Sequence, residues 1–331
     1  MIRKLTVYVS KTTDPHENLA QEKFLTFCTE PEECILFLWQ NDHTVVIGRN
    51  QNCWKECRTA ELEAAGGHLV RRLSGGGAVY HDLGNLNFTF CLRKKEADVP
   101  RQLSVICRAL SKFGLEAELT GRNDLTVGGR KFSGNAFFDS RGFYYHHGTL
   151  LVETNVSEMT RFLQPSESKL RSKSVDSVRS RVVNLAELCP EITVESLSRA
   201  MREAFSEVYG MPAEDFPESR REDREIRLHR ETFASREWTY GERIAFTNSF
   251  ARRFSWGEAE LALRVCGGTV EDAVLSSDAM AYSWFAEAGQ AFRGCRYEPE
   301  ALCTALKEEL GQRGAPEKVQ EELCGMIRED F

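Results

Sequence analysis

The residues best suited to bind an anion lie in one stretch, from Arg71 to Asn87, which reads RRLSGGGAVYHDLGNLN. Gly75, Gly76 and Gly77 have no Cβ, so a ligand can approach their main chain closely and positive φ angles are allowed. Their N–H groups could turn toward an anion, and Arg71 or Arg72 could add charge-assisted hydrogen bonds. The alternative is a glycine-rich hairpin loop that binds nothing. The stretch alone leaves both interpretations open.

A second stretch, residues 121–138, places a lysine beside a tight turn and reads GRNDLTVGGRKFSGNAFF. Gly128-Gly129 predicts a hairpin turn between strands near 124–127 and 130–138. Lys131 alternates with Phe132, so the two side chains point to opposite faces of the strand. If Phe132 faces the core, Lys131 is a solvated lysine; if Lys131 faces a cleft, it is a fixed cation beside main-chain amides.

Two further segments carry polar groups. Residues 144–152 predict a strand that contains His146 and His147. Adjacent strand residues face opposite ways, so these histidines cannot chelate one metal together, and one of them is expected to be buried or to line a wall. Residues 168–184 are cationic, rich in serine and without apolar periodicity. They form either a solvated linker or a mobile flap over an anion.

The common nucleotide-binding motifs do not match. A Rossmann pattern that begins at Gly75 needs a glycine at position 80, which is Tyr80. Gly129 and Gly134 have the spacing of a P-loop, but Asn135 stands where that loop needs lysine. Any phosphate chemistry therefore uses a less common cradle.

Apolar periodicity predicts the elements that must position these groups. Strands are expected near 5–9, 35–39, 45–49, 68–70, 87–92, 124–127, 130–138 and 144–152, and a hairpin with Gly267-Gly268 at its turn near 261–270. The strand over 87–92 alternates as if it had one buried face. Helices are expected at 16–28, 54–65, 101–113, 156–163 and 194–208, and two more close the chain. Ten of the fourteen residues from Glu218 to Glu231 are charged, which suggests a boundary region.

Composition narrows the class of protein. The 331 residues suggest roughly two domains, with 41% apolar and 28% charged residues. A net charge of −7 argues against a nucleic-acid partner. The chain shows neither a signal peptide nor an apolar run of about 18 residues, so we expect no membrane partner and a cytoplasmic location. The eleven scattered cysteines predict reduced thiols, most of them buried.

Taken together, the blocks resemble the bacterial lipoate–protein ligases, within the wider biotin/lipoate ligase superfamily. The similarity covers nearly the whole chain, including residues 254–257 near the C-terminus. Several long motifs in the right order are more specific than any one glycine run. The residues that carry the resemblance are Trp39, Val45–Asn52, Arg71–Asn85, Gly121–Leu125, Arg130–Gly134, His146–Leu151 and Ser174–Val182.

The resemblance implies an α+β fold: a catalytic domain over 1–243, with mixed, largely antiparallel sheets flanked by helices, and a small α/β accessory domain over 244–331. It implies a two-step reaction. Lipoate or octanoate and MgATP give the acyl-AMP and pyrophosphate, and the acyl group then passes to a lysine of an acceptor protein. The implied acceptors are apo lipoyl domains of the E2 subunits of 2-oxoacid dehydrogenases and the glycine-cleavage H protein. A monomer is expected.

By the same resemblance, Lys131 is the catalytic residue, which contacts the lipoyl carbonyl and the α-phosphate. Asp124 is a plausible contact for magnesium. Candidates for the acyl-pocket wall are Trp39 and Val46, together with Val79. Residues 168–184 correspond to a loop that orders over the adenylate. The implied lipoate- and ATP-binding residues are Arg71, Arg72, Ser74, Gly75, Gly76, Gly77, Ala78, Val79, Tyr80, Asn85, Asn123, Asp124, Gly134, His147, Gly148, Thr149 and Arg179.

Two alternatives remain. An octanoyl- or lipoyl-transferase on the same fold would work through a cysteine thioester, which needs a positioned nucleophilic thiol. No cysteine lies inside the glycine-run, Lys131 or histidine blocks, and Cys91 lies nearby on a strand with core alternation. A non-catalytic module that binds lipoyl domains is the other alternative, and the presence of Lys131 and the full loop counts against it.

Overall fold

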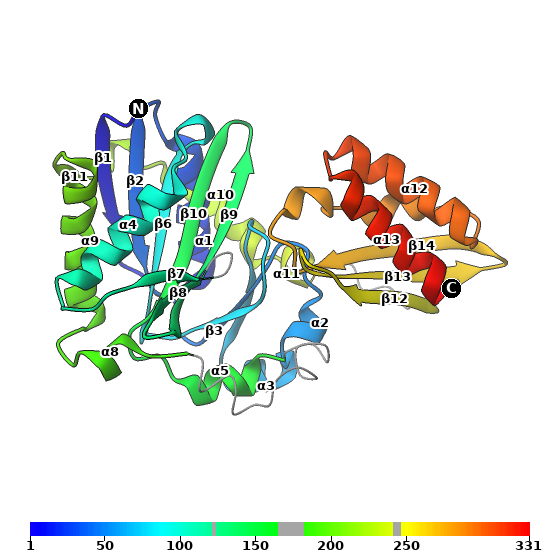
Figure 1. Ribbon diagram of the computed structural model, residues 1–331, viewed down its shortest axis with the longest axis horizontal. Coiled ribbons are helices and arrows are strands. Elements are labelled where there is room, and N and C mark those ends of the chain that lie inside the picture. Colours follow the sequence, from blue (N-terminus) through cyan, green and yellow to red (C-terminus); the bar gives the residue numbers. More distant parts are fainter. Residues whose placement is uncertain (121–123, 165–181, 241–245) are drawn as a thin grey trace. The chain divides into compact units, whose positions relative to one another are not determined.

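The computed structural model describes residues 1–120, 124–164, 182–240 and 246–331, with the side chain of Tyr282 excepted. These residues form two compact units. Unit 1 comprises Met1–Val46, Cys57–Val70 and Val79–Thr239, and unit 2 comprises Ile47–Glu56, Arg71–Ala78 and Tyr240–Phe331. Each unit has its own apolar core. The predicted α+β class is confirmed, since both units combine sheets with helices (Figure 1).

Unit 1 is built on a mixed sheet that has eight strands in the described part of the chain. Its strand order is β11-β1-β2-β6-β10-β9-β8-β7, with parallel pairs at β11-β1-β2 and antiparallel pairs from β2 onward. The bounds in this order are Ala213–Asp215, Lys4–Val9, Glu33–Trp39, Asn85–Arg93, Phe143–Leu151, Arg130–Ser140, Asp124–Val127 and Glu118–Thr120. A small sheet holds β4 (His68–Arg71), β3 (Thr44–Ile47) and β5 (Val79–His81).

Helices cover both faces of the large sheet (Figure 1). The helices α4 (Val99–Ser111) and α9 (Val194–Tyr209) pack on one face and share a core with Phe88 and Phe90 of β6. Helix α1 (Pro15–Cys28) packs on the other face, and α10 (Asp223–Ala234) packs along α1. Further α-helices among the described residues of this unit are α3 (Thr59–Ala64), α5 (Val156–Phe162), α8 (Leu185–Leu188) and α11 (Arg236–Tyr240), the last of which ends in unit 2.

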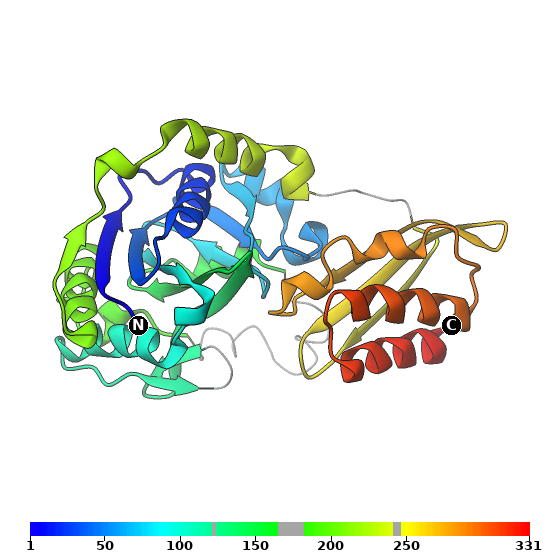
Figure 2. The same cartoon turned by 90° about the horizontal axis from the view of Figure 1, so that it is seen from above.

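Unit 2 pairs an antiparallel sheet with two helices. The strands β12 (Asn248–Arg253), β13 (Glu258–Cys266) and β14 (Thr269–Ser277) lie in that order, and Gly267-Gly268 makes the predicted turn with positive φ at both residues. Helices α12 (Pro299–Gln312) and α13 (Glu317–Asp330) pack on one face of this sheet, as Figure 2 shows. The short helix α2 (Cys53–Glu56) also belongs to this unit.

Three sequence predictions need correction. The helix expected over 54–65 is two helices, α2 and α3, because the chain makes a bridge to Leu163 at Cys57. Strand β6 is buried on both faces from Asn85 to Leu92, because α1 covers the face that carries its polar residues. The charged region 218–231 lies within unit 1, since α10 packs on α1 and Arg220 and Arg230 pair with Glu33 and Asp14.

Candidate functional site

Lys131 of β9 is neither fully solvated nor buried. Its Nζ lies 2.8 Å from Oδ1 of Asp124 on β8, and the two side chains are 39% and 37% exposed. Phe132, the next residue, is fully buried in the core, so the alternation predicted from the sequence is confirmed. An exposed ion pair of this kind is weak, so a ligand anion can replace Asp124 as the partner of the ammonium.

The Lys131 ammonium lies over Gly134 on the same strand. A Cβ at Gly134 would come 3.2 Å from Lys131 Nζ, and the Gly134 N–H donates to Oγ1 of Thr149 at 3.3 Å. Gly148 on β10 is needed for close approach, because a Cβ there would lie 2.7 Å from the carbonyl oxygen of Gly134 and from the ring of Phe88. Unit 1 therefore places the Lys131 ammonium and the Thr149 hydroxyl beside two glycines, Gly134 and Gly148, which have no side chains of their own.

The two histidines point to opposite faces of β10, as predicted. His146 is fully buried, with Nδ1 2.9 Å from Oε1 of Gln102 and Nε2 2.9 Å from Oδ1 of Asn135. Burial lowers the pKa of His146 to about 3, and His147 contributes to the same shift, so the His146 ring is neutral at physiological pH. His147 lies on the α1 side, where its Nδ1 is 2.7 Å from Oε1 of Glu22.

Of the residues predicted for the acyl wall, Trp39 and Val46 are buried in unit 1 and Val79 is partly buried there. Trp39 ends β2 at 4% exposed, and Val46 pairs with Val79 between β3 and β5. Tyr80 is also buried, with its hydroxyl 3.1 Å from Nδ1 of His43. The Asn85 amide donates to Oδ1 of Asn87 at 2.9 Å.

The predicted glycine loop belongs to unit 2, and its two arginines bind the main chain. Arg71 is 5% exposed and donates from Nη1 to the carbonyl oxygens of Gly48, Arg49 and Gln51. Arg72, equally buried, donates from Nε to Oγ of Ser74 and from Nη2 to the carbonyl oxygens of Gly75 and Gly77. Burial lowers the pKa of Arg71 to about 10, which still leaves a full charge at neutral pH. These contacts make both arginines shape the loop.

The glycines of this loop allow tight packing. A Cβ at Gly75 would lie 2.2 Å from the carbonyl oxygen of Ala279, and the Gly76 N–H donates to that oxygen at 3.2 Å. Gly76 has a φ of 89°, a backbone conformation that favours glycine. A Cβ at Gly48 would meet the Gly76 oxygen at 2.2 Å. The loop is a packed structure, held from within unit 2.

Several predictions lie outside the described residues. Asn123, Arg179 and most of the 168–184 segment fall there, as does the expected boundary between residues 243 and 244. Among the residues that the structure does describe, no group of three or more His, Cys, Asp or Glu side chains is arranged to hold a metal ion. Within the same residues, no helix has the length and apolar character needed to cross a membrane.

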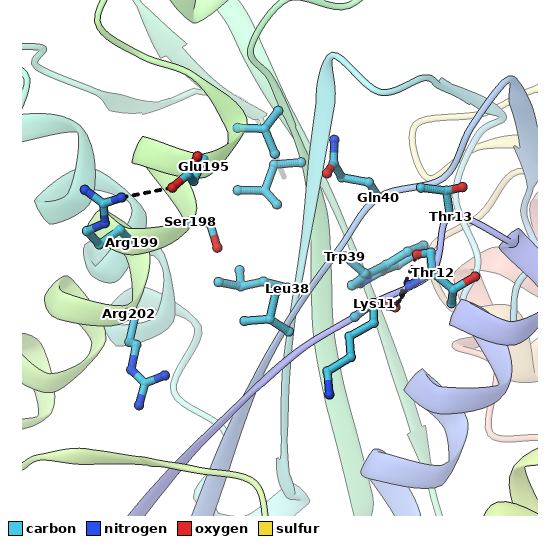
Figure 3. Close-up of a pocket in the computed structure, with 14 residues that line it drawn as sticks. Lys11, Thr12, Thr13, Leu38, Trp39, Gln40, Glu195, Ser198, Arg199 and Arg202 are labelled. Carbon is cyan, nitrogen blue, oxygen red and sulfur yellow. Dashed lines mark hydrogen bonds and ion pairs between the residues drawn. The ribbon is translucent and has the colours of Figure 1, made fainter.

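A pocket of about 620 Å³ lies in unit 1, between the ends of β1 and β2 and helix α9 (Figure 3). Leu38 and Leu86 contribute to its lining, and Lys11, Arg199 and Arg202 supply three cations. Arg199 pairs with Glu195 and Arg202 with Asp215. Trp39 also lines this pocket, so its lining combines apolar side chains with cations.

Sequence reasoning missed the buried carboxylate of Glu22. Glu22 of α1 is 1% exposed and contacts both Thr89 and His147. A signal was available, because Glu22 is three residues from both Leu19 and Leu25 and so lies on the apolar stripe of its helix. A charged residue on such a stripe is buried only with partners.

Comparisons with known proteins agree with this fold. The P. falciparum LipL1 crystal structure, a complex with lipoate, has a TM-score of 0.80 and 28% identity over 97% of this chain and 99% of that chain. A crystal structure of lipoate-protein ligase A bound with ATP has a TM-score of 0.62 and 24% identity over 73% and 99% of the two chains. The fold is therefore that of lipoate ligases.

The sequence comparisons define the family. The model of the lipoyl protein ligase A/B catalytic domain matches residues 14–206, and that of the bacterial lipoate protein ligase C-terminus matches residues 243–327. The lipoate-protein ligase A of Psychrobacter cryohalolentis is 41% identical over 285 residues, which cover 84% of each chain. The chain belongs to the lipoate–protein ligase family and is an enzyme of the ligase class.

Proposed function

We propose that the protein activates lipoate or octanoate with ATP, releases pyrophosphate, and transfers the acyl group from the acyl-AMP to a lysine of an acceptor protein. The observation that carries this proposal is the half-exposed Lys131 ammonium over Gly134, held by the single carboxylate of Asp124. A cation held this way is available to an incoming anion.

Lys131 is the proposed catalytic residue in both steps. Attack of the lipoate carboxylate on the α-phosphate brings two anions together, so a fixed cation stabilises the charge that develops on the phosphoryl oxygens. In the second step the carbonyl of the mixed anhydride becomes an oxyanion, and the same ammonium can stabilise it. Thr149 and the main chain at Gly134 and Gly148 supply polar groups beside the cation.

Asp124 is the residue proposed to contact Mg²⁺. Magnesium is commonly held by one or two carboxylates together with substrate phosphates, and the exposed carboxylate of Asp124 fits this donor set. When bound, the ion would neutralise phosphate charge. Asn123 and Arg179 are proposed to complete the adenylate site by family resemblance alone.

The glycine loop and the acyl wall are proposed to bind the rest of the acyl-adenylate. The loop residues from Arg71 to Ala78 would present main-chain donors to the ligand, with Arg72 fixing their arrangement through its contacts to Gly75 and Gly77. Trp39 and Val46 are buried apolar side chains of the kind that an eight-carbon chain needs. We propose residues 1–243 as the catalytic domain and 244–331 as the accessory domain.

The proposed acceptors are apo lipoyl domains of E2 subunits and the glycine-cleavage H protein, as the family membership suggests. A monomer in the cytoplasm is the proposed state of the enzyme. All eleven cysteines lie in the described part of the chain and none of them forms a disulfide, which suits a reducing compartment.

Burial of Cys91 argues against the thioester transferase. Its side chain is fully buried, and burial raises the pKa of the thiol well above its usual range. A nucleophilic cysteine needs the opposite, an accessible thiol with a lowered pKa.

An assay with purified protein, ATP, magnesium and lipoate tests the proposal. We expect pyrophosphate release and, with an apo lipoyl domain present, addition of one lipoyl mass to that domain. Transfer of octanoyl from an acyl-carrier protein without consumption of ATP would replace the ligase assignment with the transferase.

A further inference from the structure

Four buried side chains of unit 1 form one hydrogen-bonded chain on the α1 side of the large sheet. Trp39 Nε1 donates to Oγ1 of Thr89 at 3.0 Å, and Thr89 Oγ1 donates to Oε1 of Glu22 at 2.8 Å. The same Glu22 oxygen lies 2.7 Å from Nδ1 of His147. None of the four side chains is more than about a tenth exposed: Trp39 is 4%, Thr89 0%, Glu22 1% and His147 7% exposed.

The sheet register explains why these residues meet. Thr89 of β6 is directly opposite His147 of β10 and, on its other side, opposite Phe37 of β2, two residues before Trp39. Side chains two apart on a strand share a face, so Trp39, Thr89 and His147 all point toward α1. Glu22 reaches them from the buried side of that helix.

The direction of each hydrogen bond is fixed by what the groups can donate. An indole N–H can only donate, so Thr89 Oγ1 accepts from Trp39 and must give its single proton to Glu22. When Glu22 is ionised its carboxylate can only accept, and the proton between Glu22 and His147 then resides on Nδ1 of the imidazole. A neutral His147 is therefore the Nδ1–H tautomer, with Nε2 as an acceptor.

We propose that Glu22 is a positioning residue of the lipoate site, which holds His147 in the Nδ1–H tautomer and, through Thr89, fixes the indole of Trp39. This rests on the proposed function, in which Trp39 lines the acyl pocket and His147 contributes to the lipoate site. A flexible acyl chain loses conformational entropy when it binds. If the side chains of the pocket wall are already fixed, they lose no further entropy on binding. Loss of the chain of hydrogen bonds thus weakens lipoate binding rather than the chemical step.

The tautomer is measured directly by NMR of the full-length protein labelled with ¹⁵N-histidine. The chain has seven histidines, and loss of a signal in a His147→Gln variant assigns His147. We expect long-range ¹⁵N–¹H correlations typical of Nδ1–H for neutral His147 in the wild type. A neutral ring protonated at Nε2 in the wild type would overturn the proposal, whatever activity the enzyme has.

The kinetic test uses two disruptive variants and their conservative partners. Thr89→Val and Glu22→Met each break the chain of hydrogen bonds. We expect the KM for lipoate, measured by pyrophosphate release, to rise about 2- to 10-fold, which corresponds to the usual free energy of one hydrogen bond. The kcat should stay within about twofold of the wild type. Glu22→Gln keeps an oxygen that accepts from both neighbours, so it should restore the KM of the wild type.

Thr26→Val is the matched control. It removes another fully buried hydroxyl, one turn further along α1, whose O–H donates to the main-chain carbonyl oxygen of Glu22 at 2.7 Å. This variant should leave the KM for lipoate unchanged. A KM within about twofold of the wild type in both Thr89→Val and a folded Glu22→Met would refute the positioning role while leaving the ligase activity intact.

Discussion

Two of the cation–carboxylate pairs in unit 1 differ in geometry, in burial and in the number of contacts between the partners. Arg220 binds Glu33 through a fork, with Nη1 to Oε1 at 2.6 Å and Nη2 to Oε2 at 2.9 Å. The Glu33 side chain is fully buried and also accepts from Oγ1 of Thr6 at 2.7 Å. Lys131 makes one 2.8 Å contact with Asp124, and both of these side chains are more than a third exposed.

The difference separates a structural pair from a pair that can take part in chemistry. The Glu33 oxygens already have partners, and removal of Arg220 would leave the buried charge with Lys4 as its remaining cation, 3.4 Å from Oε1. The Lys131–Asp124 pair contributes little to stability, because water competes for both groups. The Lys131 ammonium can therefore exchange the Asp124 oxygen for an oxygen of a ligand without loss of the fold.

The largest expected effect is the loss of stability in Arg220→Met. This variant leaves the Glu33 carboxylate buried without its fork, so the free energy of unfolding should fall by about 3–5 kcal/mol. Urea unfolding measures it. Arg199→Met, at an exposed pair with Glu195, is the control and should change stability by about 0.5 kcal/mol or less. If both variants lowered the free energy of unfolding equally, the proposed difference between the buried and the exposed pairs would be wrong.

Lys131→Met is the counterpart in the site. Loss of one charge-stabilising donor should raise the barrier of adenylation by about 3–4 kcal/mol, or slow pyrophosphate release roughly 10²- to 10³-fold, with the unfolding curve unchanged. Arg130→Met, which removes a neighbouring cation on the same strand, should keep most of the activity. A normal rate in Lys131→Met would remove this lysine from the mechanism.

The pH dependence of stability gives a third test. Burial alone would raise the pKa of Glu33, but the hydrogen bonds from Arg220, Glu30 and Thr6 lower it to about 2. Because the folded-state pKa lies below the unfolded value, the stabilisation is present above about pH 4.5 and is lost as the pH falls toward 2. The stability gap between the wild type and Glu33→Gln should therefore narrow by roughly 3 kcal/mol from pH 6 to pH 2. A constant gap would contradict a lowered pKa.

The smallest predicted effect concerns close packing beside Lys131. In Gly148→Ala the new Cβ meets the Gly134 oxygen and the Phe88 ring at 2.7 Å, so unfolding measurements should show a loss of about 1–3 kcal/mol. Gly325→Ala, within helix α13, has its nearest neighbour at 3.9 Å and should gain about 0.5–1 kcal/mol. A neutral Gly148→Ala would show that β9 and β10 can separate without cost.

The sequence predicted what local patterns determine. The turn at Gly128-Gly129, helix α9 and the opposite orientation of His146 and His147 follow from periodicity and turn chemistry, and all three are confirmed. The ion pair of Lys131 with Asp124 could not be predicted from alternation, because it depends on a register shift between β8 and β9.

Contacts between distant segments account for the rest. The partners of Glu22 are 67 and 125 residues away, so its burial depends on how α1 packs on the sheet. The charged region 218–231 indicated a boundary by composition, whereas two of its arginines make ion pairs with residues near the start of the chain, Arg220 with Glu33 and Arg230 of α10 with Asp14. Arg71 and Arg72 indicated anion binding by type, although both donate hydrogen bonds to main-chain carbonyls of their own unit.

Isolation of the intermediate tests the central claim most directly. We would incubate the protein with lipoate, ATP and magnesium without any acceptor, and determine by mass spectrometry what remains bound after gel filtration. The account predicts bound lipoyl-AMP, formed only with ATP, absent in Lys131→Met and consumed when an apo lipoyl domain is added. Lipoylation of the acceptor without lipoyl-AMP or pyrophosphate at any stage would contradict it.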